Sequence, residues 1–116
     1  MSVIDIDQIK LSTSGDESIM FDLITMGLER IESSESEIRD ALVSEDWDSL
    51  ARIIHKLRPV LHFVGLVSLE DKLVSIEKNA KERTNLDNIN GMLAGIFTVF
   101  TSAVSELTEI RNNLKK

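Results

Sequence analysis

The sequence predicts an all-α protein, an antiparallel up-down four-helix bundle with a short extra helix at its N-terminus. Apolar residues recur at spacings of three, four and seven along four long segments, as they do on one face of a helix. The 116 residues include one proline, five glycines and no tyrosine, a composition that suits packed helices better than a sheet. The links between the segments are short, and short links join antiparallel neighbours. A chain of this length forms one domain, residues 1–116, around a single core.

The first two helices are predicted at about residues 4–11 and 15–44. The short helix is indicated by four apolar side chains, Ile4, Ile6, Ile9 and Leu11. The long helix is predicted to begin at a capping box, Ser14-Gly15-Asp16-Glu17, in which a hydroxyl precedes a carboxylate by three residues. Its apolar stripe contains Met20, Leu23, Ile24, Gly27, Ile31, Ile38 and Leu42. The segment from Glu32 to Glu37 is polar on all sides, so we expect fraying or a bend there.

The remaining helices are predicted at about residues 46–64, 68–82 and 87–114. Glu45-Asp46 provides a cap before Trp47, and Gly65 and Ser68 mark a break followed by a new N-cap. The apolar stripes of the last two helices contain Leu69, Leu73, Ile76 and Ala80, then Ile89, Leu93, Ile96, Phe97, Phe100, Val104, Leu107 and Leu114.

Composition and charge exclude several functions. A net charge of −7 argues against nucleic acid or an anionic membrane as the main partner. Cysteine is absent, which excludes disulfides and thiolate metal sites. The N-terminus is acidic, unlike a signal peptide, and the apolar stretch from Met92 to Phe100 is shorter than the roughly 20 residues that span a bilayer. We therefore expect a soluble, cytoplasmic, monomeric protein.

The segment from His55 to Gly65 carries the chemistry. At about 3.6 residues per helical turn, one side of the helix gathers apolar residues and the other side polar or small ones. The apolar side is predicted to contain Leu50, Ile53, Leu57, Val60, Leu61 and Val64, and the opposite side Ala51, His55, Arg58, Pro59 and His62. His55 is therefore predicted to point away from the core.

An exposed histidine is either inert or a phosphoryl acceptor, because neutral imidazole can attack an acyl phosphate. Arg58 lies one turn after His55, where its planar fork can meet phosphate oxygens, and Lys56 adds a second positive charge. Ala51, Pro59 and Gly65 have little side-chain bulk and would let a partner protein come close. Pro59 also removes the amide that would bond the carbonyl of His55, which predicts a kink or a strained turn at that residue.

This segment resembles the histidine-containing phosphotransfer (HPt) domain, whose signature is a histidine, a base at +3, a glycine at +4 and a glycine at +10. His55, Arg58 and Gly65 match three of these positions, with arginine in place of the usual lysine. Pro59 replaces the first glycine. The preceding run from Glu45 to Ala51 and the order of the helices also resemble the family.

The resemblance implies a phosphorelay intermediate. His55 would accept a phosphoryl group from the aspartyl phosphate of one receiver domain and pass it to another. The receivers would belong to response regulators or hybrid sensor kinases and would supply the Mg²⁺, so no cofactor is expected on this chain. The family places a polar residue, often glutamine, on the next helix to hold the histidine ring, and the matching residue here is Glu77. A carboxylate accepting from Nδ1–H would leave Nε2 as the nucleophile. A glutamate exposed to solvent is the alternative.

Two further residues have less definite roles. Lys81, one turn after Glu77, is either a positive charge near the site or a cation at a helix end. His62, seven residues after His55, is expected to be peripheral and to contact a partner or a neighbouring helix, with a second acceptor as the alternative. The histidine and glutamate spacings of helical metal sites are missing, so no metal site is expected.

Three other functions can be weighed. No glycine-rich phosphate loop is present, so the chain is expected to carry a phosphoryl group and not to be an enzyme that uses ATP. A helical adaptor with an inert histidine is one alternative. A dimerisation helix of a histidine kinase is another, but that motif has an acid where Lys56 stands and its proline one position after Pro59. It also uses two helices where four are predicted here.

Overall fold

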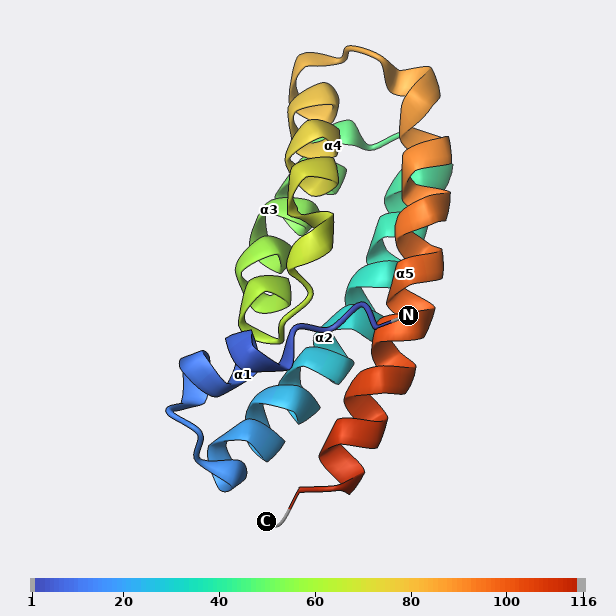
Figure 1. Cartoon of the computed structure of the whole chain (residues 1–116). Coiled ribbons are helices and arrows are strands. Elements are labelled where there is room, and N and C mark those ends of the chain that lie inside the picture. The colour runs from blue at the N-terminus through green and yellow to red at the C-terminus, as the bar shows by residue number, and fades with distance from the viewer. Residues whose placement is uncertain (1, 115–116) are drawn as a thin grey trace.

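The computed structural model describes residues 2–114. These residues form five α-helices and one short 3₁₀ turn, in the order predicted from the sequence (Figure 1). The elements are α1 (Ile6–Thr13), α2 (Glu17–Val43), α3 (Trp47–Phe63), the 3₁₀ turn η1 (Val67–Leu69), α4 (Glu70–Glu82) and α5 (Leu86–Asn112).

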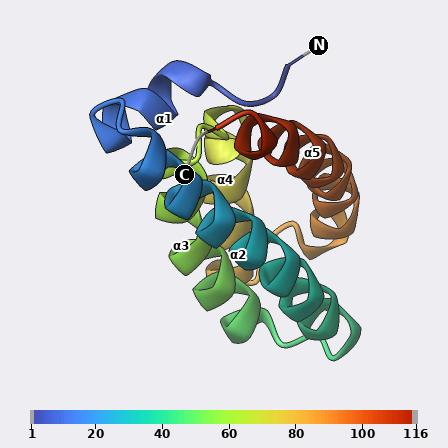
Figure 2. The same ribbon diagram turned by 90° about the horizontal axis from the view of Figure 1, so that it is seen from below.

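The four long helices run alternately up and down and enclose one core (Figure 1). Each packs against the next along the chain, and α5 closes the bundle by packing against α2. Seen from below, α1 lies outside the bundle beside the start of α2 (Figure 2). The predicted all-α helical bundle with an added N-terminal helix is therefore confirmed.

The helix caps differ in part from those predicted. Asp16, and not Ser14, is the N-cap of α2, because its carboxylate accepts from the backbone N–H of Ile19. Ser14 instead ends α1 in the left-handed conformation. Asp46 caps α3 as predicted and accepts from the N–H of Ser49. Ser68 does not cap α4, because the chain passes through η1 and the helix begins without a side-chain cap.

The polar middle of α2 remains helical, without the fraying predicted there. Ser34, at the centre of this segment, is buried between Ile31 and Ile38 on the same face of the helix. The buried stripe of α2 therefore continues through the polar run, with Ser34 at the position between Ile31 and Ile38. Serine is small enough to be buried where other positions of the stripe hold isoleucine.

The buried stripe of α3 keeps three of the predicted residues and is shifted towards Ala51 and Ile54. Its members are Leu50, Ala51, Ile54, Leu57 and Leu61. Ala51 is only 3% exposed, so its predicted place on the wet face is wrong, and Ile54 takes the core position expected of Ile53. The helix continues through Pro59, and none of its residues has a positive φ. Pro59 therefore deprives the His55 carbonyl of an amide donor within a continuous helix, and a strained, non-helical turn is not found.

Gly65 accommodates the protein's own N-terminal arm. It adopts a φ of +82°, and a Cβ at this position would overlap the backbone carbonyl of Asp5. The N–H of Asp5 donates to the Gly65 carbonyl at 2.8 Å. Farther along the arm, Glu106 of α5 accepts from the N–H groups of Val3 and Ile4 at 2.8 and 3.1 Å. The arm thus crosses from α5 to the end of α3 and covers Gly65, which is buried.

Within residues 2–114, α5 is the one helix long and apolar enough to cross a membrane by length and composition alone, with a mean hydropathy of 1.3 over its most apolar window. Its buried side chains, among them Ile89, Leu93 and Phe100, belong to the core of the bundle.

Candidate functional site

His55 lies on the outer face of α3 and is held from one side. Its side chain is 65% exposed, as the sequence predicts for this face. The ring nitrogen Nδ1 lies 3.1 Å from Oε2 of Glu77 on α4. An ionised carboxylate can only accept a hydrogen bond, so Nδ1 carries the proton and Nε2 of the neutral ring keeps its lone pair. Nε2 has no hydrogen-bond partner within the described chain.

Glu77 is the centre of the site. It is one of the few buried polar residues, 7% exposed, and three cationic or titratable groups share its two oxygens. Oε1 receives a hydrogen bond from Nη1 of Arg58 at 3.1 Å. Oε2 faces Nζ of Lys81 at 3.0 Å as well as the His55 ring. A buried carboxylate needs such partners, because an unpaired charge there would cost several kcal/mol.

The pKa of Glu77 reflects two opposing causes. Burial raises the pKa because it removes the carboxylate from water. The hydrogen bonds from Lys81 and Arg58, with the charge of His55, lower it by more, so the pKa of Glu77 lies below its ordinary 4.5. The carboxylate is therefore ionised at neutral pH and can only accept from its neighbours.

Arg58 connects the histidine helix to α4. Its side chain is 28% exposed, and its Nη2 also lies 3.8 Å from Oε1 of Glu70 in the first turn of α4. Its Nε is buried without a hydrogen-bond partner. Glu70 was not among the site residues predicted from the sequence. A signal was present, since Glu70 precedes Glu77 by seven residues and so lies two turns away on the same face of the helix.

A shallow hollow of about 390 Å³ lies beside the acceptor. The residues around it are His55, Arg58, Pro59, His62, Phe63 and Glu70. Phe63 is 46% exposed, and the ring of His62 meets it edge-on with the ring centres 6.1 Å apart. The hollow therefore combines the acceptor and a guanidinium with apolar surface that another protein can cover.

The structure separates some residues that the sequence analysis grouped together. Glu77, Arg58 and Lys81 meet around His55, and Pro59 and His62 border the hollow. Lys56 instead lines a groove between α2 and α3. Ala51 and Gly65 are both buried, so the predicted clearing for a partner is formed by Pro59 and the hollow, and not by these two residues.

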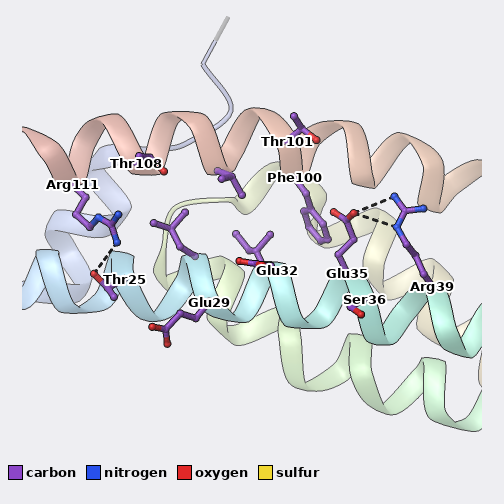
Figure 3. Close-up of a pocket in the computed structure, with 13 residues that line it drawn as sticks. Thr25, Glu29, Glu32, Glu35, Ser36, Arg39, Phe100, Thr101, Thr108 and Arg111 are labelled. Atoms are coloured by element: carbon purple, nitrogen blue, oxygen red, sulfur yellow. Dashed lines mark hydrogen bonds and ion pairs between the residues drawn. The ribbon is translucent and has the colours of Figure 1, made fainter.

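Two further features of residues 2–114 concern other kinds of site. No group of three or more histidine, aspartate or glutamate side chains there is placed to hold a metal ion. A larger hollow of about 710 Å³ lies between α2 and α5, away from His55 (Figure 3). Its lining contains no histidine.

The fold matches a solved structure closely. Neither a comparison with protein-family profiles nor one with curated proteins finds a match to the sequence. The structure is similar to the crystal structure of the HPt domain of the Hpt sensor hybrid histidine kinase from Shewanella, with a TM-score of 0.85. The likeness covers 98% of this chain and 97% of that chain at 17% sequence identity. The chain therefore has the helical-bundle fold of an HPt domain.

Proposed function

We propose that this chain is a phosphoryl carrier in a phosphorelay, with His55 as the acceptor. The observation that carries the proposal is the contact between Nδ1 of an exposed histidine and a buried, ionised carboxylate. This contact fixes the proton on Nδ1 and leaves Nε2 as the nucleophile. The HPt fold and the match of His55, Arg58 and Gly65 to the HPt signature support the same function.

The transfer is a displacement at phosphorus. Nε2 of His55 forms the new bond to phosphorus while the bond from phosphorus to the aspartyl oxygen of a receiver domain breaks, returning a free carboxylate to the receiver. Glu77 holds the imidazolium through Nδ1–H while positive charge develops on the ring. Arg58 stabilises the charge on the transferred group, and the receiver supplies the Mg²⁺. Transfer to a second receiver reverses these steps.

The partner surface in this proposal is the hollow around His55. Phe63 and Pro59 offer exposed apolar area at the centre of a polar rim, the usual arrangement of a docking surface. We further propose that the chain works as a cytoplasmic monomer with receiver domains as its partners and has no ATP site of its own.

Phosphotransfer from a radiolabelled phospho-receiver tests the proposal. The wild-type protein should take up label that is labile to acid and stable to base, and His55→Gln should take up none. His62→Gln should still be labelled, which distinguishes His55 from the second histidine. Label retained by His55→Gln would contradict the assignment. A wild-type protein that no phospho-receiver of its source organism labels would instead indicate an adaptor with an inert histidine.

A further inference from the structure

A second charged site lies between α2 and α3, on the side of α3 away from α4. It is a groove of about 220 Å³ that both helices line with polar side chains. The lining residues are Arg30, Ser34, Glu37, Ser49, Arg52, Ile53 and Lys56. Three cations face one carboxylate here, although the chain as a whole carries a net charge of −7. The groove therefore has the opposite sign to the rest of the molecule.

Ser34 gives this groove an unsatisfied hydrogen-bonding group. The residue is only 3% exposed, and no partner for its hydroxyl is found in the described part of the chain. Buried hydroxyl groups in proteins are normally hydrogen-bonded. Within residues 2–114, Arg58 Nε is the one side-chain polar atom that is fully buried and has no hydrogen-bond partner. The Ser34 hydroxyl also has no partner, so it is not fully buried, and a ligand in the groove can reach it.

The cations of the groove are also largely uncommitted. Arg30 and Lys56 form no ion pair with any described residue. Arg52 donates to the Ser49 hydroxyl at 3.0 Å, and that hydroxyl donates to Asp46 at 2.7 Å, which leaves most of the guanidinium fork open. Like charges brought together on neighbouring helices repel one another, and a bound anion relieves that repulsion.

We propose that this groove binds a small phosphate dianion, either inorganic phosphate or a small phosphomonoester. The lining residues carry three cations and one carboxylate, and this excess positive charge favours an anion even with Asp46 next to Arg52 and Ser49. Guanidinium groups and a hydroxyl are suited to phosphate oxygens. The groove is smaller than the roughly 300–1,000 Å³ of pockets for drug-sized ligands, which favours a small ligand. Glu37 can accept a hydrogen bond from a hydroxyl of the ester.

This site is distinct from the acceptor but lies close to it. Lys56 directly follows His55 in the chain and lines the groove, whereas the His55 ring contacts Glu77 on α4. A ligand in the groove would hold the Lys56 ammonium on the α2 side of the helix. The proposal does not depend on phosphotransfer, because binding can be measured without any receiver.

An NMR titration of the full chain tests the proposal. Sodium phosphate, compared with sodium chloride at equal ionic strength, should shift amide resonances of residues 30–37 and 49–56 in a saturable manner. Arg30→Gln should raise Kd about tenfold, the effect of losing one charge-assisted hydrogen bond. Ser34→Ala should raise Kd by a smaller factor. Lys72→Gln, which removes an exposed charge on α4, is the matched control and should leave Kd unchanged.

A second set of measurements identifies the source of the phosphate group. It also distinguishes binding in the groove from phosphoryl transfer at His55. Tighter binding of glycerol 3-phosphate than of inorganic phosphate would identify a phosphomonoester as the ligand, and the reverse order would identify the free ion. His55→Gln should bind phosphate as the wild type does, and Arg30→Gln should still accept label from a phospho-receiver. Shifts that do not saturate, that chloride reproduces, or that Arg30→Gln and Lys72→Gln alter equally would overturn the proposal.

Discussion

Two contacts between helices in this bundle carry arginine and glutamate side chains, one between α3 and α4 and the other between α2 and α5. Between α3 and α4, Glu77 is buried and shared by His55, Arg58 and Lys81. Between α2 and α5, Arg39 pairs at 3.1 Å with Glu35 on its own helix and lies 4.1 Å above the ring of Phe97. Arg39 lies at one end of the larger hollow between α2 and α5, and at its other end Arg111 donates to the Thr25 hydroxyl at 3.4 Å (Figure 3).

The difference lies in what each arrangement can contribute. The side chains of Arg39 and Glu35 are 57% and 31% exposed, and ion pairs so open to water are each worth about 0.2–1 kcal/mol. These arginines cover the edges of a hollow and position no reactive group. Glu77 is buried and holds the exposed ring of His55 through Nδ1, as the proposed transfer requires. The site around Glu77 is therefore a better candidate for the reactive site than the larger hollow between α2 and α5.

The largest expected effect is the loss of the shared carboxylate. Glu77→Ala should slow phosphoryl transfer to His55 about 10–100-fold, the usual loss when a carboxylate that orients a histidine is removed. Glu77→Gln keeps an acceptor for Nδ1–H and should lose less. Single-turnover labelling by a phospho-receiver measures both rates.

Glu35→Ala is the matched control on the other face, because it breaks an ion pair with Arg39 without approaching His55. Its labelling rate should equal that of the wild type. Equal slowing by Glu77→Ala and Glu35→Ala would show that labelling of His55 does not depend on the contact between α3 and α4.

The sequence predicts only part of the difference between the α3–α4 contact and the α2–α5 contact. The spacing of apolar residues predicted five helices, and residues 2–114 form five α-helices in the predicted order. The contact between Glu77 and His55 was anticipated through the resemblance to HPt domains. The spacing of Glu77 from Leu73 and Ile76 puts it at the edge of the buried stripe of α4 but does not indicate its partner. Glu70 was missed because its contact with Arg58 joins two helices. Such a contact depends on packing and not on spacing along one helix.

Ala51 and Gly65 show two other limits of sequence pattern. Alanine is apolar and small, so it fits either side of a helical wheel, and α3 buries it because other helices pack on both flanks. Gly65 was expected to let a partner protein come close, which is wrong: the residue is buried, and the group that approaches it is the Asp5 backbone of the same chain. Residues 60 positions apart leave no local signal of their contact.

The next largest effect is on the free energy of unfolding, through the contact between Gly65 and the N-terminal arm. Gly65→Ala should lower the free energy of unfolding by about 1–3 kcal/mol, because alanine is strained at positive φ and its Cβ would overlap the Asp5 carbonyl. Urea unfolding followed by circular dichroism measures the change. An unchanged midpoint would mean that the N-terminal arm does not pack on Gly65 in solution.

A glycine-to-alanine substitution on α5 should change the free energy of unfolding in the opposite direction. Gly95 lies inside the helix, is exposed, and has no atom within 4 Å of the position a Cβ would take. Gly95→Ala should therefore raise the free energy of unfolding by about 0.5–1 kcal/mol, the helix-propensity difference between the two residues. A destabilised Gly95→Ala protein would indicate that another surface packs closely against α5.

The smallest effect is a pH dependence that compares Glu77 with a second paired carboxylate, Glu106. Burial raises the pKa of Glu106, but hydrogen bonds from Ser2 and from the N–H groups of Val3 and Ile4 lower it by more, so its pKa also lies below the ordinary 4.5. A carboxyl group whose pKa is lower in the folded state stabilises the fold above its unfolded pKa. It loses that contribution as the pH falls through the folded pKa. Both residues should therefore contribute stability at neutral pH that disappears in acid.

Urea unfolding from pH 7 down to pH 3 measures these contributions. The gap in free energy of unfolding between the wild type and Glu77→Gln should be widest at neutral pH and should shrink below about pH 4.5, where the unfolded chain begins to bind protons. Glu106→Gln should follow the same course. Because the two residues share no partner, the double variant should show the sum of the two changes. A gap for Glu77→Gln that does not change with pH would mean that Arg58 and Lys81 do not hold this carboxylate in solution, and the ring of His55 would then lose its fixed orientation.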